Sequence, residues 1–182
     1  LKVNEGTSLK FLAMSEQPSY ENDIVLAKVN GKLMELRKKI TGDSEVTFIT
    51  TGETTGMQTY RRSALMVMMK AIYDCVDIRE LDSVYSDFSV NNGLFIIVNG
   101  NVTCDEAFAA KIKDRMLEII EADVPFEKFS VSVGEARAMF RKRKMYKKDR
   151  LFRYRRNSKV NLYSLEGFMD YFYGYMVPST GY

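Results

Sequence analysis

The stretch "IVLAKVNGKLMEL", residues 24–36, decides the fold of the first part of the chain. Asn30-Gly31 is the strongest short-range signal of a β-hairpin, so residues 24–29 and 32–36 are expected to pair as antiparallel strands. A further strand is expected over residues 45–50, after the turn at Gly42-Asp43.

On the N-terminal side, residues 1–3 are expected to end a strand, and Ser8 or Thr7 is expected to cap a short helix over 8–15. Strand, helix, hairpin and returning strand favour a small β-grasp sheet crossed by one helix. We therefore predict an N-terminal domain over residues 1–53, and the Gly- and Thr-rich stretch 51–57 is interpreted as its boundary.

Beyond that boundary, helices and strands alternate, which predicts a second α+β domain over residues 54–182. Helices are expected over 60–76 and 103–122 and from 132 into the segment after 140; strands are expected over 82–90, 94–98, 127–131 and 159–165. The spacings Thr103–Glu106 and Ser132–Glu135 are those of capping boxes. In the first strand, Val84, Ser86, Phe88 and Val90 share one face, which predicts a half-buried strand.

The composition excludes several classes of protein. The 182 residues are 46% hydrophobic and 28% charged, which is not typical of a disordered chain, and no apolar run approaches the ~20 residues of a membrane span. Two cysteines in unlike contexts favour a reducing compartment, so we expect a cytoplasmic protein with no membrane partner. Because the chain begins at Leu1 and stops after a turn-like Pro-Ser-Thr-Gly, we expect it to be a fragment of a longer protein.

The chain contains no histidine. This removes Ser-His-Asp and Cys-His catalysis, histidine metal ligands and the side chain best suited to proton transfer near neutral pH. No Gly-x-x-x-x-Gly-Lys-Ser/Thr loop or Gly-x-Gly-x-x-Gly fingerprint is present either. We expect neither a metal nor a cofactor in this chain.

Positive charge is concentrated in one segment. The net charge is only +3, but residues 141–159 contain eleven basic residues and one acid, Asp149. Phe140, Tyr146, Phe152 and Tyr154 interleave with the cations, as on a surface that pairs with phosphates and stacks on bases. A solvated helix face, or a surface that docks on another domain or a second subunit, fits the same pattern. The predicted basic patch comprises Arg141, Lys142, Arg143, Lys144, Lys147, Lys148, Arg150, Arg153, Arg155 and Arg156.

The first domain resembles a TGS domain, the ubiquitin-like β-grasp module of threonyl-tRNA synthetase and some GTPases. The matching stretches are "EGTSL" (5–9), "AKVNGKLMEL" (27–36) and "EVTFIT" (45–50). The rest resembles the editing domain shared by threonyl- and alanyl-tRNA synthetases. The resemblance implies a TGS domain followed by an editing-domain-like α+β sandwich.

In the editing family, a helix carries R-H-S-x-x-H and a distal segment reads D-x-C-x-G-x-H-V-P-x-T-G. Here the helix reads "YRRSALMVMMKAIY" from Tyr60 and the distal segment "DYFYGYMVPSTGY" from Asp170. The frame is kept, but the positions of the three histidines and the cysteine hold Arg62, Met66, Met176 and Phe172. Arginine stays protonated and methionine and phenylalanine are apolar, so no catalytic residue is expected at these degenerate positions.

The chain also resembles, and more closely, the N-terminal half of a group of bacterial nucleoside kinases similar to uridine kinase and phosphoribulokinase. This resemblance covers essentially all 182 residues, and residues 163–182, "YSLEGFMDYFYGYMVPSTGY", look like their version of the distal motif. That resemblance implies a kinase domain downstream in the same protein, which would carry the ATP-dependent phosphotransfer and act as a partner of this chain.

If the editing-like fold is right, the helix after Tyr60 and the segment from Asp170 line one cleft whose cations and rings suit a nucleotide or single-stranded RNA. The alternative is a repacked core covered by tyrosines. Candidate ligand-binding residues are Tyr60, Arg61, Arg62, Lys70, Asp170, Tyr173 and Thr180. The main interpretation is a non-catalytic accessory module of a nucleoside kinase that binds a nucleotide or RNA. The alternatives are a residual tRNA-editing hydrolase and a purely structural module that forms homo-oligomers.

Overall fold

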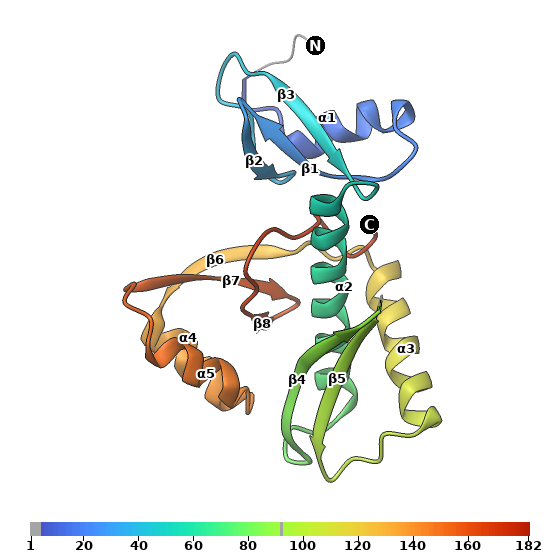
Figure 1. Cartoon of the computed structure of the whole chain (residues 1–182), viewed down its shortest axis with the longest axis vertical. Helices are drawn as coiled ribbons and strands as arrows, with labels where there is room; N and C mark the ends of the chain where they lie inside the picture. Colours follow the sequence, from blue (N-terminus) through green and yellow to red (C-terminus); the bar gives the residue numbers. More distant parts are fainter. Residues whose placement is uncertain (1–4, 92) are drawn as a thin grey trace. The chain divides into compact units, whose positions relative to one another are not determined.

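The computed structural model describes residues 5–91 and 93–182, so the strand end expected at residues 1–3 lies outside the described residues. The predicted α+β class is confirmed: the described residues form five α-helices and three small antiparallel sheets (Figure 1). Contacts divide them into two compact units. Unit 1 contains the residues up to Leu65 together with Ile120–Phe126 and Phe172–Tyr182, and unit 2 contains Met66–Ile119 and Glu127–Tyr171. The boundary expected near residue 53 stays a prediction.

Unit 1 contains the predicted hairpin and its covering helix. The strands β1 (Ile24–Val29), β2 (Lys32–Glu35) and β3 (Val46–Thr50) form an antiparallel sheet in the order β2-β1-β3. Asn30 and Gly31 take positive φ angles of 49° and 78°, as the two-residue turn requires. Helix α1 (Leu9–Glu16) begins at the predicted cap, because the Ser8 hydroxyl accepts a hydrogen bond from Phe11 N at 3.2 Å. A short 3₁₀ helix, η1 (Gln17–Ser19), follows α1.

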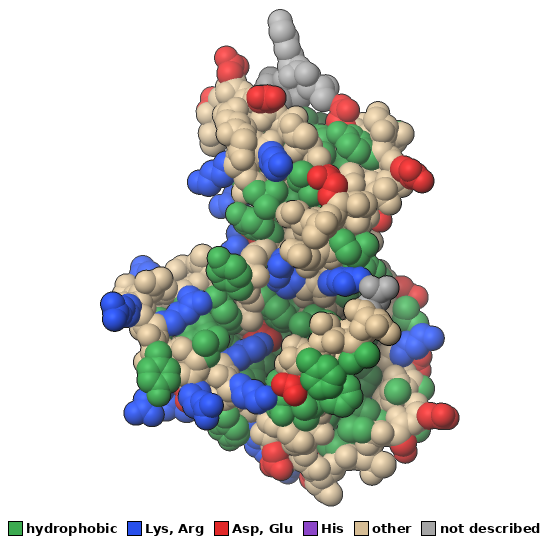
Figure 2. Space-filling model, viewed as in Figure 1, with side chains coloured by type: hydrophobic (Ala, Val, Ile, Leu, Met, Phe, Trp, Pro, Cys, Tyr) green, Lys and Arg blue, Asp and Glu red, His purple; other side chains and the backbone are tan. Residues whose placement is uncertain are grey.

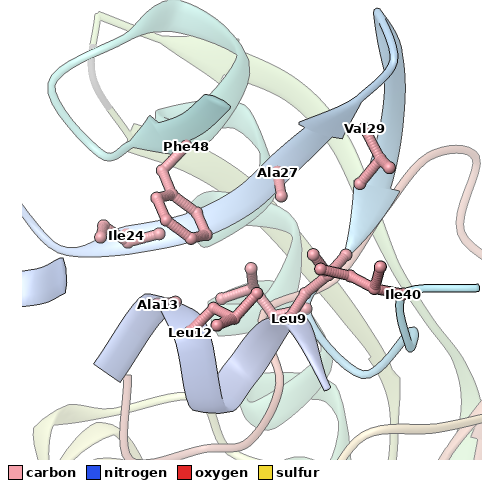
Figure 3. Packing of buried hydrophobic residues seen from close by; sticks show 9 residues of the cluster. Leu9, Leu12, Ala13, Ile24, Ala27, Val29, Ile40 and Phe48 are labelled. Atoms are coloured by element: carbon pink, nitrogen blue, oxygen red, sulfur yellow. The ribbon is translucent and has the colours of Figure 1, made fainter. Parts of the chain in front are cut away.

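The core of this sheet lies between α1 and the strands. Leu9, Leu12 and Ala13 of α1 are buried, and they form one cluster with the apolar residues of the sheet and its loops; Figure 3 shows these side chains pointing toward one another. Burial of such side chains is the main favourable term in the stability of a small unit of this kind. The cluster members from the sheet and its loops are Ile24, Ala27, Val29, Leu36, Ile40 and Phe48.

Helix α2 (Thr54–Cys75) begins six residues before the predicted start at Tyr60. Gly56, a glycine of the predicted boundary stretch, lies inside the first turns of this helix. A Cβ on Gly56 would stand 1.9 Å from the carbonyl oxygen of Thr50, so glycine is required there by a close backbone approach. Residues 54–57 of the predicted boundary stretch are therefore helical, and the boundary itself stays a prediction.

In unit 2, β4 (Leu81–Val90) and β5 (Gly93–Gly100) form the predicted hairpin, and α3 (Glu106–Glu121) follows. The cap of α3 differs from the prediction, because the Asp105 carboxylate, one residue before the helix, accepts from Phe108 N at 2.8 Å. The prediction of a half-buried β4 is wrong over its second half: Val84 is buried, but Phe88 and Val90 are exposed. Alternation sorts residues onto two faces only while the register holds, and the pairing of β4 with β5 shifts between Ser86 and Ser89.

The rest of unit 2 is a sheet in the order β6-β7-β8, with two helices inserted between its first two strands. The strands are β6 (Glu127–Ser132), β7 (Lys159–Leu165) and β8 (Phe168–Asp170), and the helices are α4 (Val133–Lys142) and α5 (Tyr146–Arg153). The capping box of Ser132 and Glu135 is confirmed. The basic segment therefore covers the end of α4, a turn in which Lys144 has φ +55°, and α5. Among the residues that the structure describes, no helix has the length and apolar character needed to span a bilayer.

Candidate functional site

Arg62 and Gly174, two motif positions far apart in the sequence, meet within unit 1. Arg62 Nη1 donates a hydrogen bond to the carbonyl oxygen of Tyr175 at 2.6 Å. Gly174 has φ +121°, and a Cβ at this residue would stand 2.6 Å from Arg62 Cζ. The guanidinium therefore holds the backbone of the distal segment, and glycine permits its close approach.

Ser63 fixes the next residues of the distal segment. Its hydroxyl donates to the carbonyl oxygen of Thr59 at 2.9 Å and accepts from Val177 N at 3.0 Å, while Met176 Sδ lies 3.4 Å away. Met176 N donates to Glu35 Oε1 at 3.3 Å. These bonds lie in a buried environment, because Ser63, Met176 and Glu35 are each less than 5% exposed. Ser63 thus positions backbone here, and none of its described contacts, with Thr59 O, Val177 N and Met176 Sδ, is a base that would activate the hydroxyl as a nucleophile.

The four degenerate positions offer no imidazole and no thiolate. Met66 and Met176 are buried, Arg62 is bound to a carbonyl, and Phe172 is partly buried. A buried thioether can fill space but cannot accept a proton from water near neutral pH. The residues present therefore do not fit a zinc ligand set or a general-base site.

Thr180, a predicted ligand contact, is part of the backbone pairing within unit 1. Its hydroxyl accepts from Val124 N and its own N–H donates to Val124 O, both at 2.9 Å. Beside it, Asp123 accepts from Gly181 N at 3.1 Å. The Ser179 hydroxyl and the Gly181 N–H lower the pKa of Asp123, and the charge of Lys10 adds to the effect.

Three other predicted ligand contacts of unit 1 are accessible. Tyr60 and Arg61 are exposed on α2, and Tyr173 is 87% exposed on the distal segment. Exposed tyrosine rings can stack on bases.

Lys70 and Asp170 lie in unit 2, and each is paired there. Lys70 Nζ lies 2.7 Å from Asp74 Oδ2 and 3.3 Å from Glu166 Oε2, and it is 4% exposed. Asp170 is fully buried, pairs with Lys148 and accepts from Tyr171 N at 2.7 Å. Each of these two side chains is therefore paired with an opposite charge within unit 2.

The structure divides the basic patch into two groups, and the first faces inward. Arg143 donates to the carbonyl oxygens of Met169 and Gly167 at 3.0 and 2.7 Å, and burial lowers its pKa. Lys144 donates to the carbonyl oxygens of Arg79 and Leu81. The other two members are Lys148, which pairs with Asp170, and Arg155, which donates to the Tyr171 hydroxyl. These four cations hold unit 2 together.

The second group faces outward. Lys142, Arg150, Arg153 and Arg156 are exposed, and their side chains make no ion pair or hydrogen bond with any described residue. Arg141 and Lys147 are also exposed, and their ion pairs are long, at 3.6 Å to Asp149 and 3.9 Å to Asp87. Arg141 Nε also donates to the carbonyl oxygen of Arg137 at 3.4 Å, and Lys147 Nζ lies 3.2 Å from the centroid of the Tyr85 ring. Two rings are exposed among them, Tyr146 and Tyr154, the latter to 77%. We call this set of exposed cations on α4, α5 and the residues after α5 the outward basic surface; its members are Arg141, Lys142, Lys147, Arg150, Arg153 and Arg156.

Comparison with known proteins gives a consistent set of relatives. The relatives are threonine–tRNA ligases. Threonine–tRNA ligase of Rubrobacter xylanophilus is 29% identical over 181 residues, which are 100% of this chain and 28% of the relative. Threonine–tRNA ligase 1 of Bacillus subtilis is 31% identical over 185 residues, 97% of this chain and 27% of the relative. The ligase of Thermotoga maritima is 30% identical over 158 residues, 85% of this chain and 24% of the relative.

The chain thus spans about a quarter of the length of these curated relatives and corresponds to their N-terminal regions. No protein-family model matches the chain. The resemblance to threonyl-tRNA synthetase agrees with these relatives, and the expected kinase parent receives no support from them.

One cluster of unit 2 was not anticipated from the sequence. The Tyr73 hydroxyl donates to the carbonyl oxygen of Arg143 at 2.9 Å, and its ring packs on Phe168 with centroids 5.4 Å apart. Burial, and then the negative charge of Asp170, raise the pKa of Tyr73. A tyrosine at helical spacing with apolar neighbours gives no sign that its hydroxyl bonds a carbonyl 70 residues away.

Proposed function

We propose that this chain is a non-catalytic accessory module that binds RNA through the outward basic surface. The observation that carries the proposal is the division of the basic segment, in which Lys142, Arg150, Arg153 and Arg156 stay exposed without a partner among the described residues. Cations without internal partners can exchange their counterions for phosphates, which is the main source of affinity for nucleic acids.

Two further observations support an RNA partner. Tyr146 and Tyr154 are exposed among the cations, so phosphate pairing and base stacking are available on one surface. The relatives are by name ligases that act on a tRNA, so RNA is the anionic polymer that these comparisons favour.

The test is charge reversal on the outward surface. We expect the combined variant Arg150→Glu, Arg153→Glu, Arg156→Glu to lower RNA affinity strongly and to reduce the slope of log K against log salt by about three. The matched control is Lys32→Glu, Lys38→Glu, Lys39→Glu, which changes the net charge equally on exposed residues of unit 1. Equal losses in both variants, or no binding by the unaltered chain at low salt, would refute the proposal.

Arg155 does not belong in that variant. It donates to Tyr171 and lies 4.9 Å from the Phe152 ring, so its reversal would damage unit 2 as well as the surface. A variant that includes Arg155 could lose binding simply because it unfolds.

A residual tRNA-editing hydrolase is the second candidate, and the names of the relatives favour it. The side chains at the degenerate positions weigh against it, because Arg62 is engaged with Tyr175 O and Met66 and Met176 are buried. Deacylation of seryl-tRNA or alanyl-tRNA by the unaltered chain, abolished by Arg62→Ala, would establish this function in place of the first.

The identity of any further domain is a separate proposal. A nucleoside kinase parent rests on the resemblance stated above, whereas the relatives are ligases. A Gly-x-x-x-x-Gly-Lys-Ser/Thr motif in the reading frame beyond residue 182 would establish the kinase parent.

A further inference from the structure

Two phenylalanine rings are stacked on each other at the surface of the β4–β5 hairpin. The centroids of Phe88 and Phe95 are 4.9 Å apart and their planes differ by 11°, yet the two residues are 53% and 48% exposed. Val90 and Leu94, from the same strands, are exposed as well. Contiguous large apolar side chains at the surface of a soluble unit mark an interaction site.

This pair lies next to the outward basic surface. Lys147 Nζ of α5 lies 3.2 Å from the centroid of the Tyr85 ring on β4 and 3.9 Å from Asp87 Oδ1, one residue before Phe88. Lys144, in the turn before α5, donates to the carbonyl oxygens of Arg79 and Leu81 at the start of β4. In Figure 2, hydrophobic side chains gather over the hairpin, and Lys and Arg side chains gather beside them over α4 and α5.

We infer that Phe88 and Phe95 form a stacking platform for unpaired bases of RNA, with the backbone phosphates held by the neighbouring outward basic surface. This inference rests on the proposed function and deepens it by naming the form of RNA. Unpaired bases can add a third ring to the phenylalanine stack, whereas the faces of base pairs inside a duplex are covered by their neighbours.

Charge favours this occupant over a second copy of the chain. Apolar association of two hairpins would bring two outward basic surfaces of the same sign together, whereas a nucleic acid strand neutralises them. Asp87 is the one acid beside the platform in these contacts, and Lys147 lies close enough to offset its repulsion of phosphates.

The experiment compares a single-stranded RNA with a duplex of the same sequence. We expect Phe88→Ala, Phe95→Ala to lower affinity for the single strand about tenfold or more, to leave duplex affinity unchanged and to keep the salt slope. Phe88→Trp should retain binding because it keeps a flat ring. Phe11→Ala is the matched control, since Phe11 is 65% exposed on α1 in unit 1 and should not affect binding.

The outcomes separate this inference from the proposed function. Unchanged single-strand binding in Phe88→Ala, Phe95→Ala, with binding still lost on reversal of Arg150, Arg153 and Arg156, would overturn the platform and keep the RNA proposal. An unaltered chain that binds neither RNA would overturn both. Concentration-dependent self-association that Phe88→Ala, Phe95→Ala abolishes, without an effect on RNA, would assign the platform to a second copy and overturn the inference.

Discussion

The guanidinium of Arg62 lies against the backbone of Gly174 at a distance that leaves no room for a side chain: a Cβ at residue 174 would stand 2.6 Å from Arg62 Cζ. Arg62 also donates to the carbonyl oxygen of the next residue, Tyr175, at 2.6 Å. In the resembled editing family this helix position holds a histidine. In this chain Arg62 occupies that position, and it holds the backbone of the distal segment in place. The motif residues here therefore have a structural role.

Gly174→Ala is expected to destabilise the chain through two separable effects. Alanine at φ +121° is strained by about 1–3 kcal/mol, and its Cβ would push Arg62 away from Tyr175 O. Arg62→Ala removes the second effect only. A double-mutant cycle measured by urea unfolding should therefore show that Gly174→Ala costs less in the Arg62→Ala background, and equal costs in both backgrounds would contradict the contact.

Gly56→Ala is expected to reverse the usual effect of this substitution in a helix. Alanine normally stabilises a helix by up to about 1 kcal/mol over glycine, but a Cβ at residue 56 would stand 1.9 Å from the Thr50 carbonyl oxygen. Overpacking against backbone should destabilise the chain by about 1–3 kcal/mol or more. Gly134→Ala on α4 is the matched control, since its nearest neighbour is Ser132 Oγ at 3.8 Å, and it should be neutral or stabilising in thermal unfolding.

Tyr73→Phe is expected to destabilise unit 2 by about 1 kcal/mol, because the carbonyl oxygen of Arg143 loses its hydroxyl donor. Burial raises the pKa of Tyr73 in the fold above its ordinary value near 10. The stability linked to this shift is present below pH 10 and is lost as the pH rises toward the folded-state value. The unfolding free energy of the unaltered chain should therefore fall above pH 10 more steeply than that of Tyr73→Phe, as chemical denaturation at a series of pH values would measure. Parallel curves would contradict the burial of this hydroxyl.

Local patterns were sufficient to predict most of the elements. The turn at Asn30-Gly31, the cap at Ser8 and the capping box at Ser132 each depend on residues close in sequence, and the structure confirms all three. The predicted start of α2 was wrong, because a glycine that allows a close contact and a glycine that ends a helix look alike in sequence. The geometry that distinguishes them is the position of Thr50 relative to Gly56.

The candidate site was less predictable because its contacts are long-range. Nothing in the basic segment itself shows that Arg143 bonds carbonyls of β8 and its turn while Arg150 stays exposed. Likewise, the alternation in β4 predicted one face for Val84, Phe88 and Val90, but it could not show the register shift between Ser86 and Ser89 that interrupts it. The division of the cations and the exposed rings, on which both proposals depend, required the structure.

Asp123→Asn is expected to separate the conformational role of Asp123 from its charge. Asp123 has φ +45°, which asparagine tolerates as well as aspartate, and the amide oxygen can still accept from Gly181 N. The pKa of Asp123 is lowered in the fold, first by the Ser179 hydroxyl, so its charge stabilises the fold above the ordinary pKa near 3.9, and this contribution is lost as the pH falls through the lowered value.

We therefore expect Asp123→Asn to cost less than about 1 kcal/mol at pH 7, and the difference from the unaltered chain to shrink as the pH falls below 4. Asp43→Asn, in an exposed loop of unit 1, controls for the loss of one negative charge. The measurement is urea unfolding between pH 3 and pH 7. A difference that stays constant over this range would show that Asp123 acts through its backbone conformation, and a difference matched by Asp43→Asn would assign the effect to net charge.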